Sequence, residues 1–433
     1  MTGGRQRRKR LLRKARQAAG VAEATHISSL GDDLVREIFL RLPSLVRHAC
    51  TCPAWRRVVA SSPAFRRRFR ALHPAPLLGL FADNEYSGHF RLPAFAPADD
   101  SRSDADVLAA LRGGDFGLAA LDAQERDAGE VEPRRWLVAD CRDGYLLLVN
   151  WDAAVLAAVN PISPRRLSYI PLPYVKHRED ITDRHRGYVK GLRDVHWLSS
   201  SDDDPMSFRL VWLYLDESRV RAAVFSSATW DWRILPWVEV ARMPQEEDEW
   251  LQSGTQANGV LCWRIGNEEN LLILDTKTMS FSVWELSGLG LLALDNWQHG
   301  SLGVVAGEAK NGDLCIVRHT PLSIKVLTRQ ADYDGVEKWL THDRVLSWDE
   351  DFLIDNYGRL DSLAIMAGIL YFVAGEVVMS LCLETMRMEE LFTTPSDLHY
   401  SFARLYPYFV AWPPSLVGNR GRFVEVQDDP GNA

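Results

Sequence analysis

The sequence lacks the long apolar run that a membrane span requires. No stretch of eighteen consecutive apolar residues occurs in its 433 residues, and a transmembrane helix needs about that many. The N-terminal residues have no apolar core, so we predict no signal peptide. A hydrophobic fraction of 46% is nevertheless ordinary for a chain that folds around a core.

Cysteine is sparse and scattered. Only two of the six cysteines are close in sequence, and a C-x-C within a short helix suits neither a disulfide nor a zinc pair. We therefore expect reduced, buried thiols in an intracellular protein. The six are Cys50, Cys52, Cys141, Cys262, Cys315 and Cys382.

Catalytic motifs are also missing. The sequence has no H-E-x-x-H, phosphate-binding loop, G-x-S-x-G or kinase motif, and the Gly288-Leu-Gly290 segment lacks a third glycine. His177, His185 and His196 are spaced too irregularly for a metal site to be favoured over solvated loop histidines. We predict no catalytic residues, no metal, no cofactor and no enzymatic activity.

Acidic charge is scarce in the first part of the chain and abundant in the rest. Residues 1–82 hold 17 Lys and Arg against 4 Asp and Glu, while the whole chain has a net charge of −8. The acidic remainder disfavours nucleic-acid binding, because phosphates would be repelled. The basic run Arg5–Arg16 is compatible with a nuclear localisation signal, a transit peptide or a solvated tail. We expect a nuclear or cytoplasmic protein with no membrane partner.

Residues 28–72 have the pattern of a small helical module. Asp32 and Asp33 stand where acidic residues favour a helix start. An apolar stripe follows, and Pro43 ends it. Ser44 can begin a second helix, Pro53 a third, and Ser62-Pro63 restarts the chain. The stripe consists of Leu34, Ile38 and Leu42, widened by Val35 and Phe39.

This module resembles an F-box, and most closely the F-box proteins of grasses. The matching residues are Leu30, Asp32, Asp33, Leu34, Ile38, Leu42, Pro43, Leu45, Cys52, Trp55 and Arg56, followed by the phrase Pro76–Phe81. Two departures are Gly31, where the family usually has Pro, and a slightly short segment after Pro43.

The resemblance implies a Skp-type adaptor as partner and, through it, a cullin. The implied adaptor-binding residues are Leu30, Asp32, Leu34, Val35, Ile38, Leu42, Pro43, Leu45 and Trp55. The residues themselves point the same way, because forty-five residues cannot bury so many apolar side chains. The alternative is that this apolar face packs on the rest of the chain.

From residue 134 the chain repeats short units of strand, polar turn, strand, turn and strand. Unit starts lie near residues 144, 208, 259, 303 and 368, and glycines at several starts suit hairpin turns with φ > 0. The middle strand is nearly all apolar, so we expect it to be buried on both faces. This pattern predicts an all-β propeller of about six blades, possibly seven. One blade would be split, with the runs 77–81 and 134–141 closing against 402–412.

The first unit resembles the F-box-associated β-propeller domain of plant F-box proteins. The matching residues are Asp143, Gly144, Leu146, Leu147, Val159, Asn160, Pro161, Pro171, Leu172 and Pro173. Three Trp-Asp pairs lack the Gly-His partner of true WD repeats, so we attribute them to chance and generic packing. Among loop aromatics, Trp237, Trp250, Trp297 and Trp339 are candidates for a recognition surface.

The predicted organisation is a disordered basic tail (1–26), an F-box (27–73), a junction (74–141), a propeller-like recognition domain (142–413) and a C-terminal tail (414–433). The predicted function is a substrate receptor of an SCF-type ubiquitin ligase. Two alternatives are a nuclear propeller scaffold or repressor that acts without the ligase, and a propeller hydrolase, which the apolar first strands disfavour. The substrate, any small-molecule co-receptor role and the oligomeric state are left open.

Overall fold

The computed structural model divides the chain into two units, Met1–Leu72 and His73–Ala433. The predicted basic tail, Pro43, Leu45 and the second predicted helix lie outside the residues that the structure describes. Those residues are 30–42, 55, 58, 62–73, 75–83, 92–98, 105–121, 136–151, 153–162, 166–173, 192–198, 207–216, 219–240, 254–257, 259–264, 270–285, 303–319, 323–331, 337–347, 360–394, 404–409 and 424–425.

The described part of the first unit contains helices α2 (Asp32–Phe39) and α5 (Pro63–Leu72). α2 begins at the predicted acidic pair and ends before Pro43. α5 begins with a proline at its first helical position, and the Ser62 hydroxyl accepts the Phe65 N–H at 3.2 Å, which caps the helix. Trp55 and Val58 are also helical. These residues agree with a helical module, but they do not make up the complete predicted F-box.

The second unit is built mainly of antiparallel strands, and the helix α6 (Ala105–Gly113) precedes most of them. The described strands form five sheets. The first contains β2 (Ala94–Pro97), β1 (Leu77–Asp83) and β24 (Arg404–Phe409). The second contains β3 (Leu137–Arg142), β4 (Tyr145–Asn150), β5 (Val155–Val159), β6 (Arg166–Pro171) and β25 (Val424–Glu425).

The third sheet contains β7 (Leu192–Leu198), β8 (Arg209–Asp216), β9 (Arg219–Ser226), β10 (Asp231–Ile234) and β11 (Val238–Glu239). The fourth contains β12 (Thr255–Ala257), β13 (Val260–Arg264), β14 (Asn270–Asp275) and β15 (Ser280–Glu285). The fifth has eight strands: β16 (Gly303–Glu308), β17 (Leu314–His319), β18 (Ser323–Ala331), β19 (Glu337–Ser347), β20 (Leu360–Met366), β21 (Ile369–Ala374), β22 (Val377–Cys382) and β23 (Arg387–Thr393).

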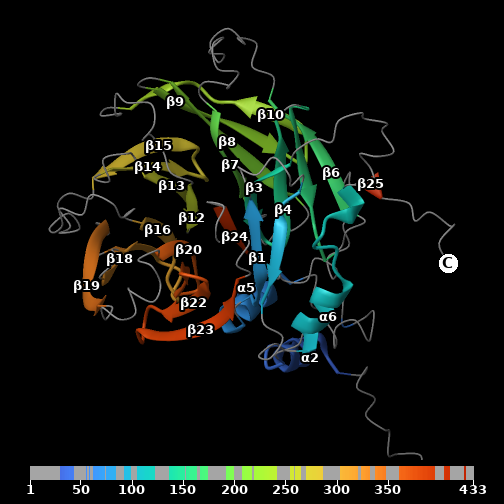
Figure 1. Cartoon of the computed structure of the whole chain (residues 1–433), viewed down its shortest axis with the longest axis vertical. Coiled ribbons are helices and arrows are strands. Elements are labelled where there is room, and N and C mark those ends of the chain that lie inside the picture. The colour runs from blue at the N-terminus through green and yellow to red at the C-terminus, as the bar shows by residue number, and fades with distance from the viewer. Residues whose placement is uncertain are drawn as a thin grey trace, which may run out of the picture. The chain divides into compact units, whose positions relative to one another are not determined.

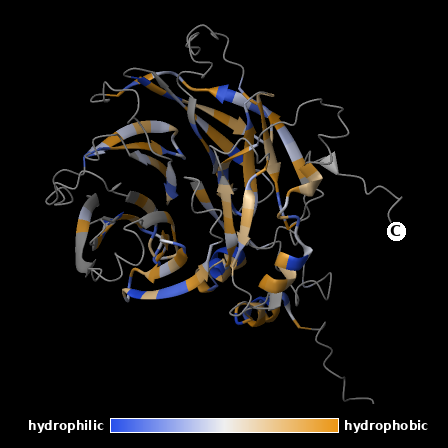
Figure 2. Cartoon of the chain, in the orientation of Figure 1, coloured by the Kyte–Doolittle hydropathy of each residue, from blue (hydrophilic) through white to orange (hydrophobic). Residues whose placement is uncertain are grey.

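The sheets lie side by side around a common centre in a propeller-like arrangement (Figure 1). Strands β3, β7 and β12 lie towards that centre, and β10, β15 and β19 lie outside. Hydrophobic residues lie along most of the strands, which are coloured largely in orange shades (Figure 2). One apolar cluster joins the second and third sheets and another joins the third and fourth. Burial between neighbouring sheets therefore holds the unit together.

The hairpin turns lie at the glycines that were predicted to adopt positive φ values. Gly144, Gly259 and Gly368 have φ values of 74°, 78° and 76°. Asp143 and Ala367, which precede two of them, also have positive φ. Two successive residues with φ > 0 fit the twist of a tight hairpin. The glycines thus set where β3 turns into β4 and where β20 turns into β21.

The predicted closure of the ring is confirmed for the run 77–81, which pairs with β24, but it is wrong for the run 134–141, whose described residues form β3 of the second sheet. β1 pairs antiparallel with β24, with Phe81 opposite Tyr406. The Tyr406 hydroxyl donates to the carbonyl of Val138 in β3 at 3.0 Å, and the Tyr408 hydroxyl donates to the Gly144 carbonyl at 2.8 Å. Segments more than 260 residues apart are therefore joined where the ring closes.

The predicted blade count is wrong, because the described strands form five sheets rather than six or seven. The strands of 303–347 and 360–393, which we expected as separate blades, join through a parallel pair between Gly307 and Ile365. A Cβ atom at Gly307 would lie 2.3 Å from the Ile365 Cβ. The glycine therefore permits the backbone approach that merges the two sets of strands.

Candidate functional site

Helix α2 has two apolar sides, of which one is buried and the other is exposed to solvent. Val35 and Phe39 are buried, and the Phe39 ring packs edge-on against Trp55 with 5.8 Å between centroids. Leu34 is 51% exposed and Ile38 is 40% exposed. The first pair is the local core, whereas the second is apolar surface that folding has left in water.

The predicted adaptor-binding residues are therefore not equivalent. Leu34, Ile38 and Asp32 are exposed, Leu30, Leu42 and Trp55 are half-buried, and Val35 lies inside. Pro43 and Leu45 lie outside the described residues. We call Leu34 and Ile38 the exposed α2 pair.

Charged residues flank the exposed α2 pair without covering it. Arg36 pairs with Asp33 at 2.8 Å, and Arg68 of α5 pairs with Glu37 at 2.6 Å. These ion pairs are largely exposed, so each contributes at most about 1 kcal/mol. They help to orient the helix and leave its apolar face open.

Replacing Gly31 by proline is expected to stabilise the first unit by a few tenths to about 1 kcal/mol. Gly31 precedes α2 with φ −63° and ψ 151°, which proline adopts without strain, and nothing lies within 4 Å of a Cβ placed there. The gain arises because the unfolded chain becomes less flexible. Chemical denaturation of both proteins measures it, and a loss of stability in the proline variant would contradict the argument.

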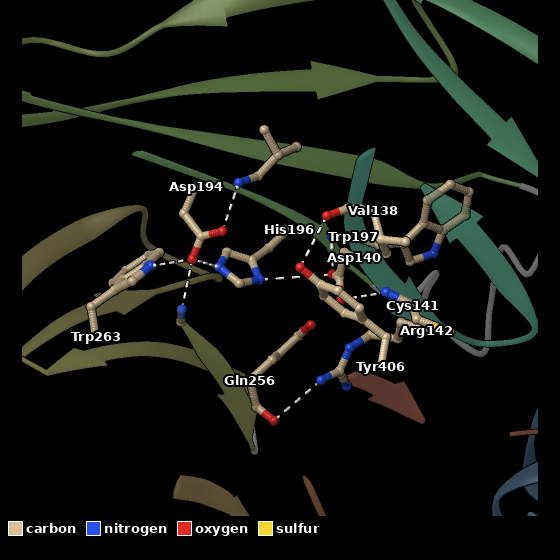
Figure 3. A network of polar contacts seen from close by, with 12 residues as sticks. Val138, Asp140, Cys141, Arg142, Asp194, His196, Trp197, Gln256, Trp263 and Tyr406 are labelled. Atoms are coloured by element: carbon tan, nitrogen blue, oxygen red, sulfur yellow. Dashed lines mark hydrogen bonds and ion pairs between the residues drawn. The ribbon is translucent and has the colours of Figure 1, made fainter. Parts of the chain in front are cut away.

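A buried polar network lies where the second, third and fourth sheets meet (Figure 3). Its centre is His196 of β7, which is 5% exposed. The ring Nε2 lies 2.7 Å from the Asp194 carboxylate, and Nδ1 lies 3.7 Å from that of Asp140 in β3. One imidazole therefore stands between two carboxylates from different sheets.

Both aspartates come directly after an irregularity in their strand, and the carboxylate oxygens of both accept the same kinds of hydrogen bond. The register shifts between Val138 and Asp140 in β3, and between Leu192 and Asp194 in β7. In each aspartate, Oδ1 accepts the next backbone N–H along the chain, at 2.8 Å for Asp140 and 3.1 Å for Asp194. The bulges re-aim these side chains, so that Oδ2 is free to reach the neighbouring sheet.

The Oδ2 atoms hold successive sheets together. Asp140 Oδ2 accepts the Trp197 N–H of β7 at 2.7 Å. Asp194 Oδ2 accepts the Gly254 N–H at 2.6 Å and the Trp263 indole N–H of β13 at 3.0 Å. A related contact joins the fourth sheet to the fifth, where the Thr255 hydroxyl accepts the N–H of Ala306.

The network keeps His196 charged. Burial alone disfavours the imidazolium, but the negative charge of Asp194 and the hydrogen bonds to both aspartates raise the pKa of His196 to about 10. Burial likewise disfavours the Asp140 carboxylate, yet His196 and Arg142 outweigh it and lower the pKa of Asp140. At neutral pH the His196 imidazole therefore carries a proton on both ring nitrogens. It has no free nitrogen with which to accept a proton as a general base.

Of the three histidines that were weighed as a metal site, only His196 lies among the described residues. His177 and His185 lie outside the described residues, and His196 faces two carboxylates in an ion pair. Among the described residues no group of three or more His, Cys, Asp or Glu is placed to hold a metal ion.

Of the four aromatic residues predicted to lie in loops, Trp237 lies between strands as expected, but Trp339 lies in strand β19, so that prediction is wrong for Trp339. The Trp237 ring stacks under Arg221, with 4.3 Å from the guanidinium carbon to the ring centroid. Trp339 packs against Trp284, over which Arg329 lies at 3.8 Å. Trp250 and Trp297 lie outside the described residues. The two described rings are half-buried packing residues that also contribute to the surface.

Among the described cysteines, Cys382 is expected to react with iodoacetamide at least about tenfold faster than Cys262 or Cys315. Burial raises the pKa of Cys262 and of Cys315 to about 12. Burial also disfavours the Cys382 thiolate, but hydrogen bonds from Thr385 and Glu384 lower its pKa. Mass spectrometry of labelled peptides tests the order, and equal labelling under native conditions would contradict it.

Sequence reasoning missed the two aspartates of the network. Asp140 and Asp194 stand within short strands and carry no motif, and the only local signal is an acid in an otherwise apolar stretch. Their role depends on β-bulges and on neighbours that are 57 to 69 residues away.

None of the helices in the described part of the chain is long and apolar enough to cross a membrane.

No family model and no curated protein matches this chain. Solved structures with a similar arrangement include a chain of the nidogen/laminin complex, with 14% identity, a TM-score of 0.31, and coverage of 62% of this chain and 80% of that one. The WD40 domain of SCAP from fission yeast has 10% identity and a TM-score of 0.29, with coverage of 60% and 56%. A protein of unknown function from Desulfotomaculum acetoxidans has 11% identity and a TM-score of 0.32, with coverage of 58% and 66%. These distant likenesses carry no functional argument.

Proposed function

We propose that this chain is an F-box substrate receptor of an SCF-type ubiquitin ligase. In this proposal the exposed α2 pair binds a Skp-type adaptor, and the adaptor connects the chain to a cullin. The propeller-like second unit holds the protein that is to be ubiquitinated. The chain performs no bond chemistry itself, and its contribution is to raise the local concentration of substrate lysines at the transfer site.

The observation that carries the proposal is the exposure of Leu34 and Ile38. They belong to the residue pattern that resembles the F-box, and they remain 51% and 40% exposed although Val35 and Phe39 beside them are buried. Adjacent exposed leucine and isoleucine side chains on a helix suit a partner groove that reads residues four positions apart. The part of the chain in which they lie carries excess basic charge, which would also favour an acidic adaptor.

The experiment is affinity purification of the tagged chain from cells in which the proteasome is blocked. The expected result is co-purification of a Skp-type adaptor and a cullin, together with the substrate protein. Absence of any adaptor from the wild-type preparation would overturn the proposal. A nuclear scaffold or repressor would instead retain its partners when the exposed α2 pair is replaced.

A further inference from the structure

The turn between β16 and β17 contains an asparagine that is followed by a glycine. Asn311 and Gly312 are both exposed, and no atom of the described residues lies within 4 Å of a Cβ placed at Gly312. Gly312 has φ 87°, a conformation that glycine adopts without steric cost. The backbone nitrogen of a glycine can attack the side-chain amide of a preceding asparagine, because no Cβ atom hinders the approach.

The side chain of Asn311 is held at both of its polar atoms by Asp313. The backbone N–H of Asp313 donates to Asn311 Oδ1 at 3.1 Å, and Asn311 Nδ2 donates to Asp313 Oδ2 at 2.7 Å. The donor at Oδ1 lies where negative charge develops when a nucleophile attacks the amide carbon. The Gly312 N–H donates to the carbonyl of Ala309 at 2.9 Å, and this bond must open before the Gly312 nitrogen can attack.

We infer that Asn311 is a site of spontaneous deamidation and that the product loosens the turn in which it lies. In the first step the Gly312 nitrogen forms a bond to Asn311 Cγ and the Cγ–Nδ2 bond breaks. The side-chain nitrogen leaves as ammonia and takes the proton of the Gly312 N–H. Water then opens the resulting succinimide ring and gives an aspartate or an isoaspartate. The inference does not depend on ligase activity.

Deamidation replaces an attractive contact in this turn by a repulsive one. The donor Nδ2 gives way to a carboxylate oxygen that faces Asp313 Oδ2, so a hydrogen bond is lost and two like charges are brought together. The turn also contacts the hairpin of β20 and β21. The Gly368 N–H donates to the carbonyl of Glu308 at 2.9 Å, and a Cβ at Gly368 would lie 2.9 Å from the backbone nitrogen of Lys310. Loosening the turn therefore weakens the contact between the two hairpins.

The first test incubates the native full chain in water enriched in heavy oxygen, at neutral and at mildly alkaline pH. Peptide mapping by mass spectrometry should show conversion of Asn311 to the acid, with one heavy oxygen atom incorporated and isoaspartate among the products. Conversion should be faster at alkaline pH, because the Gly312 nitrogen attacks after it has lost its proton. The Asn311→Gln chain should convert at least about tenfold more slowly, because its longer side chain must close a larger ring.

A second asparagine followed by glycine provides a control for the assay. Asn258 precedes Gly259 in the sequence and lies outside the described residues. In the urea-denatured chain both Asn258 and Asn311 should convert. If both convert there while Asn311 of the native chain stays unchanged over the same time, the inference is overturned.

The second test measures the effect of the product on the turn. Hydrogen exchange of the backbone amides in residues 309–313 should be about fivefold faster in the Asn311→Asp chain than in the wild-type chain, since repulsion replaces a hydrogen bond. The double variant Asn311→Asp, Asp313→Asn again places a donor opposite an acceptor, so its exchange should return towards the wild-type rate. Unchanged exchange in the single variant, or no recovery in the double variant, would refute the loosening of the turn. Neither test involves an adaptor, so failure of this inference and failure of the proposed ligase function are distinguishable.

Discussion

Replacement of Asp194 by alanine is expected to lower the free energy of unfolding of the second unit by about 3–5 kcal/mol. The carboxylate accepts hydrogen bonds from Gly254 and Trp263 and pairs with the buried His196. Its removal leaves a buried cation short of a partner and buried donors without an acceptor, and each loss is costly. Urea denaturation monitored by tryptophan fluorescence measures the change.

Asp231 provides a matched control for this substitution. It is exposed, and its carboxylate accepts the N–H of the next residue, Trp232, as Asp140 and Asp194 do with theirs. Asp231→Ala should change the unfolding free energy by no more than about 0.5 kcal/mol. Equal effects of the two substitutions would show that the links between sheets contribute little.

The stability of the second unit should also depend on pH through the protonation of His196. The pKa of His196 is raised from 6.5 to about 10 in the folded chain, so its stabilising contribution is complete below about pH 6.5 and is lost as the pH rises through about 10. A shift of this size corresponds to several kcal/mol. The difference in unfolding free energy between the wild-type chain and a His196→Gln variant should therefore shrink between pH 7 and pH 10. A difference that stays constant over that range would contradict the charged state of His196.

The contribution of Asp140 to stability depends on pH in the opposite direction to that of His196. The folded-state pKa of Asp140 lies below its usual value of 3.8. Its contribution is present above that value and is lost as the pH falls through the depressed pKa.

The second large effect concerns the first unit. Replacing both Leu34 and Ile38 by aspartate should weaken capture of a Skp-type adaptor by at least about a hundredfold, because two central apolar contacts of about 2 kcal/mol each would be lost. Thermal stability should barely change, since both side chains are already exposed to water. Quantitative pull-down and thermal melting of the same preparations separate the two readouts.

Two further variants make this experiment decisive. Leu340→Asp introduces the same charge at a 45% exposed leucine of the second unit and should leave adaptor capture intact. Val35→Asp, at a position 4% exposed, should instead destabilise the first unit, because it buries a charge beside Phe39. Full adaptor capture by the Leu34→Asp, Ile38→Asp chain would remove the exposed α2 pair from the proposed function.

Local chemistry in the sequence determined where several elements begin or turn. Acidic residues before the apolar stripe predicted the start of α2, and Ser62-Pro63 predicted the start of α5. Gly144 and Gly368 predicted the hairpin turns, and the apolar run of residues 77–81 predicted a strand that closes against the end of the chain. These features follow from backbone conformation and hydrophobic periodicity, which neighbouring residues express by themselves.

Only the tertiary structure decided which apolar residues of α2 are core and which are surface, since Leu34 and Val35 are equally hydrophobic in sequence. It also decided the number of sheets, because the close approach at Gly307 depends on a strand nearly sixty residues away. The ion-paired His196 and its two aspartates likewise come together through bulges and contacts between sheets. Long-range pairing of this kind leaves no periodic mark in the sequence, since its energy depends on distances that exist only after the sheets have assembled around their centre.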